Sequence, residues 1–215
     1  MINQASPKLR IVCSWYSSGN RQFGNDRLSS TAQKFAVREI VDPESERDNT
    51  LPSVEVFSEH MKKLRIRKDD IIVCYDMNGF SSVARTAWML RYFGATHVRI
   101  MDGGLEKWKK EGRALHSGSY VPGDGLPEGE IADYAYSIVD PGFAVKIHQM
   151  HEIAKGLYNG SKDVQVVDLR PAARFNGLVD EPEGLRRGHI TGAINIPVAM
   201  FSNPETWQLL PKPQL

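Results

Sequence analysis

Two cysteines, Cys13 and Cys74, are the side chains of this sequence best suited to nucleophilic or sulfur chemistry. A cysteine reacts as its thiolate, which requires access and surroundings that lower the thiol pKa. Both lie inside short apolar runs, LRIVCSW (9–15) and IIVCY (71–75), that are typical of buried strands. We therefore predict that both are small core residues and expect no disulfide framework. Catalysis by Cys74 remains the weaker alternative.

Asp76 follows Cys74 by two residues, at the point where the apolar run ends and a loop leads into a helix. The stretch DDIIVCYDMNGFSSVARTAWMLRYFGA (69–95) thus predicts a strand, a short loop and a helix. Such a loop directs backbone N–H groups at the residue ending the strand, a geometry that stabilises an anion or a thiolate. We expect the Asp76 carboxylate to cap this loop and fill the anion position itself. The alternative, a general base, lacks a nucleophile nearby in the sequence.

The composition is that of a globular protein, with 41% apolar and 25% charged residues. A formal charge of +1 argues against a nucleic-acid binder. The sequence contains no apolar run of bilayer length, phosphate-binding loop, dinucleotide glycine pattern, CxxC pair or metal-ligand cluster. We therefore expect no cofactor, no metal, no nucleic acid and no membrane span.

Apolar periodicity predicts strands that alternate with helices, which indicates an α/β fold with a mostly parallel sheet. Pro52 precedes a helix over about 53–64, Ser81 is the expected N-cap of the next helix, and Gly94 ends it. The predicted strands are 9–15, 35–41, 71–75 and 97–100, and a short helix follows at 105–112.

The same plan restarts after a segment rich in glycine and proline, residues 113–135, which we interpret as a linker. The expected elements are a strand at 144–147, a helix at 148–160, a strand at 164–170 and a turn and strand over 186–198. The sequence thus predicts a first domain at 1–112 and a second at 136–215. The second contains no counterpart of the strand, loop and helix of 69–95, so we expect it to be incomplete.

Four segments carry a family resemblance. They are TLPSVEVFSEHMKKLRI (50–66), the stretch from IIVCYD to WKKEG (71–112), VVDLRPAARFNG (166–177) and GLRRGHITGAINIP (184–197). Together they resemble the rhodanese family, and their order is similar to that of the two-domain thiosulfate and 3-mercaptopyruvate sulfurtransferases. The resemblance implies tandem rhodanese-like domains, each a mostly parallel sheet flanked by helices.

The resemblance also implies a chemistry. A cysteine thiolate takes sulfane sulfur from thiosulfate or a mercapto acid and passes it from a persulfide to a thiol or cyanide. In two-domain members this cysteine belongs to the second domain, and the corresponding loop of the first domain is inert. Asp76 at the nucleophile position matches the inert kind.

The resemblance assigns roles to residues of the second domain as well. Arg174 matches an arginine that binds the anionic donor, and a guanidinium suits forked oxygens. The alternative is a surface arginine paired with a nearby acid. Asp168 and Arg170 resemble a structural pair at a strand end, and His189 resembles a structural histidine that bonds to the backbone.

These interpretations lead to three functional hypotheses. The first is a rhodanese-like sulfurtransferase that takes a small anionic sulfur donor, in a chain that lacks the nucleophile and is expected to be inactive alone. The second is a non-catalytic accessory or scaffold subunit of a larger complex, with a protein partner that covers the second domain. The third is an active enzyme that uses Cys74 or a partner's cysteine. By analogy we expect a mitochondrial location, with the cytoplasm as the alternative.

Overall fold

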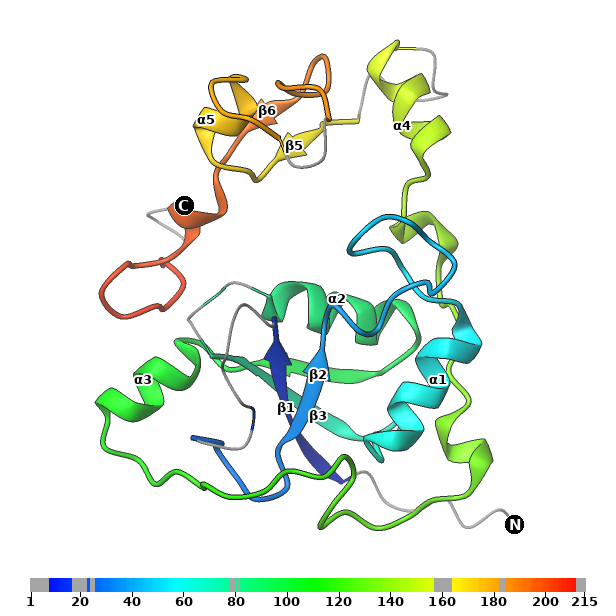
Figure 1. Cartoon of the computed structure of the whole chain (residues 1–215), viewed down its shortest axis with the longest axis vertical. Coiled ribbons are helices and arrows are strands. Elements are labelled where there is room, and N and C mark those ends of the chain that lie inside the picture. Colours follow the sequence, from blue (N-terminus) through cyan, green and yellow to red (C-terminus); the bar gives the residue numbers. More distant parts are fainter. Residues whose placement is uncertain are drawn as a thin grey trace. The chain divides into compact units, whose positions relative to one another are not determined.

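The computed structural model describes residues 8–16, 23, 26–77, 80, 82–156, 164–181 and 185–211. The chain forms two compact units (Figure 1). The first runs to Asp140 and includes Thr206–Gln208, and the second comprises Pro141–Glu205 and the residues from Leu209.

The first unit contains a four-stranded parallel sheet in the order β2-β1-β3-β4. The central strands, β1 (Leu9–Trp15) and β3 (Ile71–Asp76), pair on both sides, which explains their continuous apolar runs. The outer strands are β2 (Gln33–Ala36) and β4 (His97–Ile100). The predicted α/β class with a parallel sheet is confirmed.

The predicted strand at 35–41 is wrong beyond Ala36. β2 pairs with β1 only up to Trp15, the last residue of that strand. After this point the sheet offers no further partner, and the N–H groups of Glu39 and Ile40 donate to the Ala36 carbonyl. The chain therefore turns where the strand was expected to continue.

Three helices accompany this sheet (Figure 1). α1 (Val54–Lys63) begins after Ser53, whose hydroxyl accepts the Val56 N–H at 3.3 Å. α2 (Val83–Tyr92) is followed by Gly94 at φ +99°, as expected for a helix stop, and α3 is Gly104–Lys110. The predicted N-cap Ser81 lies outside the described residues, and Ser82 precedes α2.

An aromatic cluster forms part of the core of the first unit. The Phe57 ring of α1 stacks on Phe93 with centroids 4.1 Å apart and meets Tyr136 edge-on at 5.1 Å. Tyr136 follows the short 3-10 helix η1 (Ile131–Tyr134) and donates its hydroxyl proton to the Ile66 carbonyl. The residues after α3 therefore help to close this core.

Residues 113–135, interpreted from the sequence as a linker, pack within the first unit. Arg27 and His116 exchange two backbone hydrogen bonds of 2.8 Å. The buried Gln33 side chain of β2 accepts the Gly123 N–H at 2.7 Å. Gly123 has a φ of +76°, and a Cβ there would lie 2.8 Å from a backbone carbonyl oxygen. This segment consequently belongs to the packing of the first unit.

The second unit contains short elements (Figure 1). The predicted strand at 144–147 is wrong, because Lys146 is the N-cap of α4 (Ile147–Ala154). Its N–H donates to the Gln149 side chain at 2.8 Å, which starts a helix at Ile147. The other elements are η2 (Pro141–Phe143), β5 (Val167–Asp168), α5 (Ala172–Phe175), β6 (Ile194–Asn195) and η5 (Val198–Phe201). β5 and β6 are parallel, and β5 is shorter than the strand predicted at 164–170, while β6 is the strand of the turn and strand predicted over 186–198.

Candidate functional site

Asp76 ends β3 and lies at the N-terminus of α2. Its side chain is buried, and Oδ2 accepts the N–H of Ser82 at 2.5 Å and that of Val83 at 3.1 Å. The Ser82 hydroxyl lies 3.3 Å from the same oxygen. Two amides and a helix N-terminus thus surround a carboxylate, an arrangement that stabilises a negative charge. We call Asp76, Ser82 and the Val83 N–H the first-unit cradle.

A chain of buried hydroxyls lies behind this cradle. Ser14 Oγ is 2.7 Å from both Ser82 Oγ and Thr86 Oγ1, and all three side chains are buried. Ser14 lies beside Asp76 in the register of β1 and β3. Sequence reasoning missed Ser14 and Thr86, although a polar residue at the carboxyl end of a strand next to β3 is a usable signal.

Both cysteines are buried, as expected from the sequence. Cys74 has no exposed surface, and burial raises the pKa of its thiol to about 12. Burial likewise raises the pKa of Cys13 well above its ordinary value. In the sheet register Cys74 lies opposite Val12 and Cys13 opposite Tyr75, so the thiols point to opposite faces. Neither is available as a thiolate at neutral pH.

Arg174 lies in α5 and contacts a carboxylate of its own unit. Its Nε donates to Glu181 Oε1 at 3.2 Å, and its Nη2 donates to Glu181 Oε2. The Arg174 side chain is 38% exposed, whereas that of Glu181 is only 4% exposed. The arginine is therefore accessible and paired with an acid of its own unit, which is the second of the two alternatives left open by the sequence.

Asp168 and Arg170 form a close pair at the end of β5. Arg170 donates to both carboxylate oxygens of Asp168 at 2.7–3.0 Å, and these bonds hold the pKa of Asp168 below its ordinary value. Arg170 also donates to Glu181 Oε1 and to the Gly188 carbonyl, at 2.9 and 2.7 Å. The Asn195 amide of β6 donates to the carbonyls of Asp168 and Arg170. Hydrogen bonds of this pair thus connect β5 to Glu181, to Gly188 and to β6.

His189 contacts α5. Its Nδ1 donates to the Phe175 carbonyl at 2.9 Å, since a carbonyl can only accept. Its ring stacks on the Phe175 ring with centroids 3.7 Å apart. These are the contacts of a residue that orients α5 and its arginine.

Comparisons with known proteins identify the family. A family model for the rhodanese-like domain matches residues 35–111. The 3-mercaptopyruvate sulfurtransferase of Escherichia coli K12 is 37% identical over 76% of this chain and 54% of its own length. The human 3-mercaptopyruvate sulfurtransferase is 32% identical over 96% of this chain and 67% of its own length. The chain belongs to the rhodanese family of sulfurtransferases.

The fold of this rhodanese chain agrees with that assignment. The crystal structure of SseA, a 3-mercaptopyruvate sulfotransferase from Escherichia coli, matches with a TM-score of 0.77 and 29% identity. The match covers 97% of this chain and 75% of that one. The chain spans about half to two thirds of the length of the two curated relatives named above.

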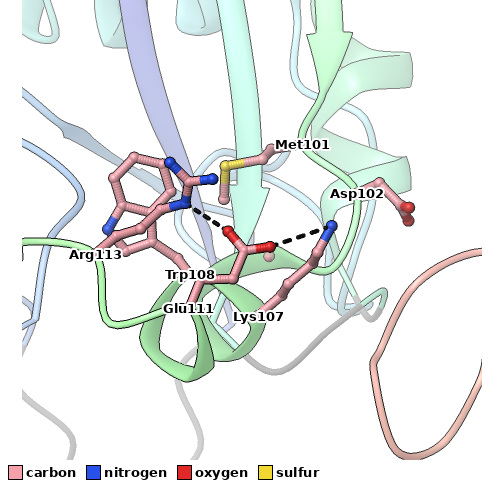
Figure 2. Close-up of a pocket in the computed structure, with 7 residues that line it drawn as sticks. Met101, Asp102, Lys107, Trp108, Glu111 and Arg113 are labelled. Atoms are coloured by element: carbon pink, nitrogen blue, oxygen red, sulfur yellow. Dashed lines mark hydrogen bonds and ion pairs between the residues drawn. The ribbon is translucent and has the colours of Figure 1, made fainter.

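This rhodanese chain also has a hollow of about 290 Å³ on α3. Figure 2 shows the Glu111 carboxylate between the Lys107 amine and the Arg113 guanidinium, at 3.6 and 2.5 Å. Arg113 in turn lies over the Trp108 ring, 5.1 Å from its centroid. Because these charged groups satisfy one another at the surface, we assign the hollow no part in the chemistry. Its lining residues are Met101, Asp102, Gly104, Lys107, Trp108, Glu111 and Arg113.

The residues that the structure describes contain neither a metal-ligand cluster nor a membrane-spanning helix. Within that part of the chain, no histidine, cysteine and carboxylate side chains gather in a group of three or more that could ligate a metal. Likewise, none of the helices described is both long and apolar enough to traverse a bilayer.

Proposed function

We propose that this chain belongs to a sulfane sulfur transfer system in which Arg174 binds the anionic donor, thiosulfate or a mercapto acid. The observation that carries the proposal is the accessible Arg174 guanidinium, which pairs with Glu181, a carboxylate only 4% exposed, in the segment that resembles the sulfurtransferases. A guanidinium presents parallel N–H groups that fit the oxygens of a sulfonate or a carboxylate.

The transfer itself requires a thiolate. It attacks the outer sulfur of thiosulfate, the S–S bond breaks, and sulfite leaves with the bonding electron pair. The resulting persulfide then yields its outer sulfur to a cyanide or thiolate acceptor, and the enzyme thiolate is regenerated. Arg174 stabilises the anionic part of the donor during the first step. Cys13 and Cys74 are too deeply buried to take the nucleophile's role, so the thiolate comes from outside these 215 residues.

The 215-residue polypeptide is therefore expected to bind thiosulfate without turning it over. Calorimetry should detect thiosulfate binding, and Arg174→Ala should weaken it by about tenfold or more, because one charge-assisted pair is lost. Thiocyanate formation from thiosulfate and cyanide should be absent in both the parent and Cys74→Ser, with an active two-domain sulfurtransferase as the positive control. Turnover that disappears in Cys74→Ser would instead establish Cys74 as the nucleophile.

A specific observation favours the second candidate, an accessory or scaffold subunit. Among the described residues of 141–205, none is buried. β1 pairs with strands on both sides, whereas β5 pairs only with β6 in the part that the structure describes. An open strand edge beside apolar side chains suits coverage by another polypeptide segment. Side chains of this kind include Ile147, Leu169, Leu178, Leu185 and Met200, which are 48–75% exposed.

Under this second candidate, the apolar side chains of the second unit are expected to bind the dye ANS strongly in the isolated polypeptide. A protein partner that covers them should abolish that fluorescence and form a defined complex in light scattering. An isolated polypeptide that is monodisperse and does not increase ANS fluorescence would contradict the accessory role. By analogy we also propose a mitochondrial location, which cell fractionation tests.

A further inference from the structure

Glu181 holds two arginines at once. Its carboxylate accepts the Arg174 side chain through Nε and Nη2, and the Arg170 side chain through Nη1 at 2.9 Å. Hydrogen bonds from Arg174, with further stabilisation by Arg170, hold the pKa of Glu181 below its ordinary value. The carboxylate therefore stays ionised at neutral pH.

Arg170 gives this carboxylate a fixed position. Its Nε and Nη2 donate to Asp168, and Nη2 also donates to the Gly188 carbonyl. Glu181 is consequently held between a fixed arginine and a more accessible one. Because its side chain is only 4% exposed, it has little freedom to follow a moving partner.

The contacts of Arg174 leave one edge of its guanidinium available. Glu181 occupies the side edge, formed by Nε and Nη2. Over the described residues, Nη1 has no protein acceptor. The end-on edge, formed by Nη1 and the second proton of Nη2, can therefore receive a forked anion.

The charges around this edge cancel. Asp168 and Glu181 contribute two negative charges, and Arg170 and Arg174 contribute two positive charges. A cluster without net charge attracts anions of equal charge about equally from a distance. Discrimination between anions must then come from the orientation of the donor groups.

We propose that Glu181 is a positioning residue that fixes the Arg174 guanidinium so that its end-on edge selects forked oxyanions over spherical anions. This inference rests on the proposed donor-binding role of Arg174 and deepens it. Glu181 itself makes no contact with the donor. It sets the angle at which two parallel N–H groups meet two oxygens.

The experiment compares two monovalent anions, acetate and chloride, at constant ionic strength. Binding is followed through the arginine Nε–H resonances in ¹⁵N NMR, with Arg174→Ala to assign the Arg174 signal. In Glu181→Gln the ratio of acetate to chloride affinity should fall by about tenfold, because a neutral amide cannot hold both arginines by charge-assisted bonds. Thiosulfate, added separately, should lose affinity relative to chloride in the same variant.

Asp180→Asn provides a matched control. It makes the same change in charge one residue away, and Asp180 is 84% exposed and pairs with Arg187 rather than Arg174. The acetate to chloride ratio should stay at the parent value. A ratio that falls equally in both variants would show an effect of net charge and overturn the positioning role.

Arg174→Lys is a second variant that leaves Glu181 in place, in case Glu181→Gln does not fold. It keeps the positive charge but loses the fork, so the preference for acetate, now followed through the Nε–H resonance of the neighbouring Arg170, should also disappear. If the parent shows no response of Arg174 to acetate or thiosulfate, the proposed function fails. If the parent responds and folded Glu181→Gln keeps its ratio, only the positioning role fails.

Discussion

Asp70→Ala is expected to reduce the free energy of unfolding by about 3–5 kcal/mol, because it leaves a buried guanidinium without its counter-ion. Arg10 Nε lies 2.9 Å from Asp70 Oδ2, and both side chains are 2% exposed. The Asp70 carboxylate also accepts the N–H groups of Lys8 and Arg67 at 3.1 and 3.0 Å. The substitution therefore leaves two backbone donors without their partner in addition to the charge.

Urea unfolding followed by tryptophan fluorescence measures this change. Asp69→Ala is the control, since Asp69 is exposed next to Asp70, and its effect should stay within about 0.5 kcal/mol. The double variant Arg10→Met/Asp70→Asn should recover part of the loss, because it removes the charge that Asp70→Ala leaves behind. A loss below about 1 kcal/mol in Asp70→Ala would contradict this account.

The elements that sequence alone predicts well are those whose pattern has one structural solution. β1 and β3 are apolar on both faces because each pairs on both sides in the middle of a parallel sheet. α1 carries a serine N-cap and apolar residues at helical spacing, of which Phe57 and Met61 are buried. In such segments local propensity and tertiary packing agree.

The strand predicted at 144–147 failed because four residues are too few to distinguish a strand from the start of a helix. What decides the structure is the bond from the Lys146 N–H to the Gln149 side chain, which lies outside the apolar pattern. The expected strand at 35–41 failed for a different reason. Its length is limited by where β1 ends, a property of the partner strand rather than of its own residues.

The candidate site likewise has a part that the sequence predicts and a part that it does not. The place of Asp76 was predictable, because it follows a buried strand and precedes a helix. Ser14 had a usable signal only as a polar residue at a strand end. Its bonds to Ser82 and Thr86 were not predictable, since they depend on sheet register and helix phase across 68 and 72 residues. The Glu181 contact with Arg174 depends on a turn between them, so sequence could state only that an acid nearby was one alternative.

Asp76→Cys is expected to create an acidic thiol in a unit whose two native thiols are not ionised at neutral pH. The sulfur would occupy a position where Ser82 and Val83 direct their N–H groups, at the N-terminus of α2. Thiols at helix N-termini titrate at about 3.5–7.5, whereas a free cysteine titrates near about 8.5. We therefore expect the pKa of the new thiol to lie below about 7.5. Cys74, by contrast, has a pKa of about 12.

Thiolate absorbance at 240 nm, recorded against pH, measures this pKa without requiring a reagent to reach the sulfur. Asp69→Cys is the control, because that exposed position lies outside the first-unit cradle, and its thiol should titrate near about 8.5. A midpoint at or above that value in Asp76→Cys would mean that burial outweighs the two amides and the helix terminus.

The pH dependence of the free energy of unfolding is a second, independent test of whether the first-unit cradle stabilises a thiolate. A thiol whose pKa is lower in the folded than in the unfolded state contributes stability that is fully present above the unfolded pKa. That contribution is lost as the pH falls through the folded pKa. As the pH rises from about 5 to about 9, Asp76→Cys should thus become more stable relative to Asp76→Ser. The gain should be about 1.4 kcal/mol for each unit by which folding lowers the thiol pKa. If the stability difference between the two variants stays constant over that range, the cradle does not stabilise a thiolate, and the family's chemistry could not be restored in the first unit by supplying the nucleophile alone.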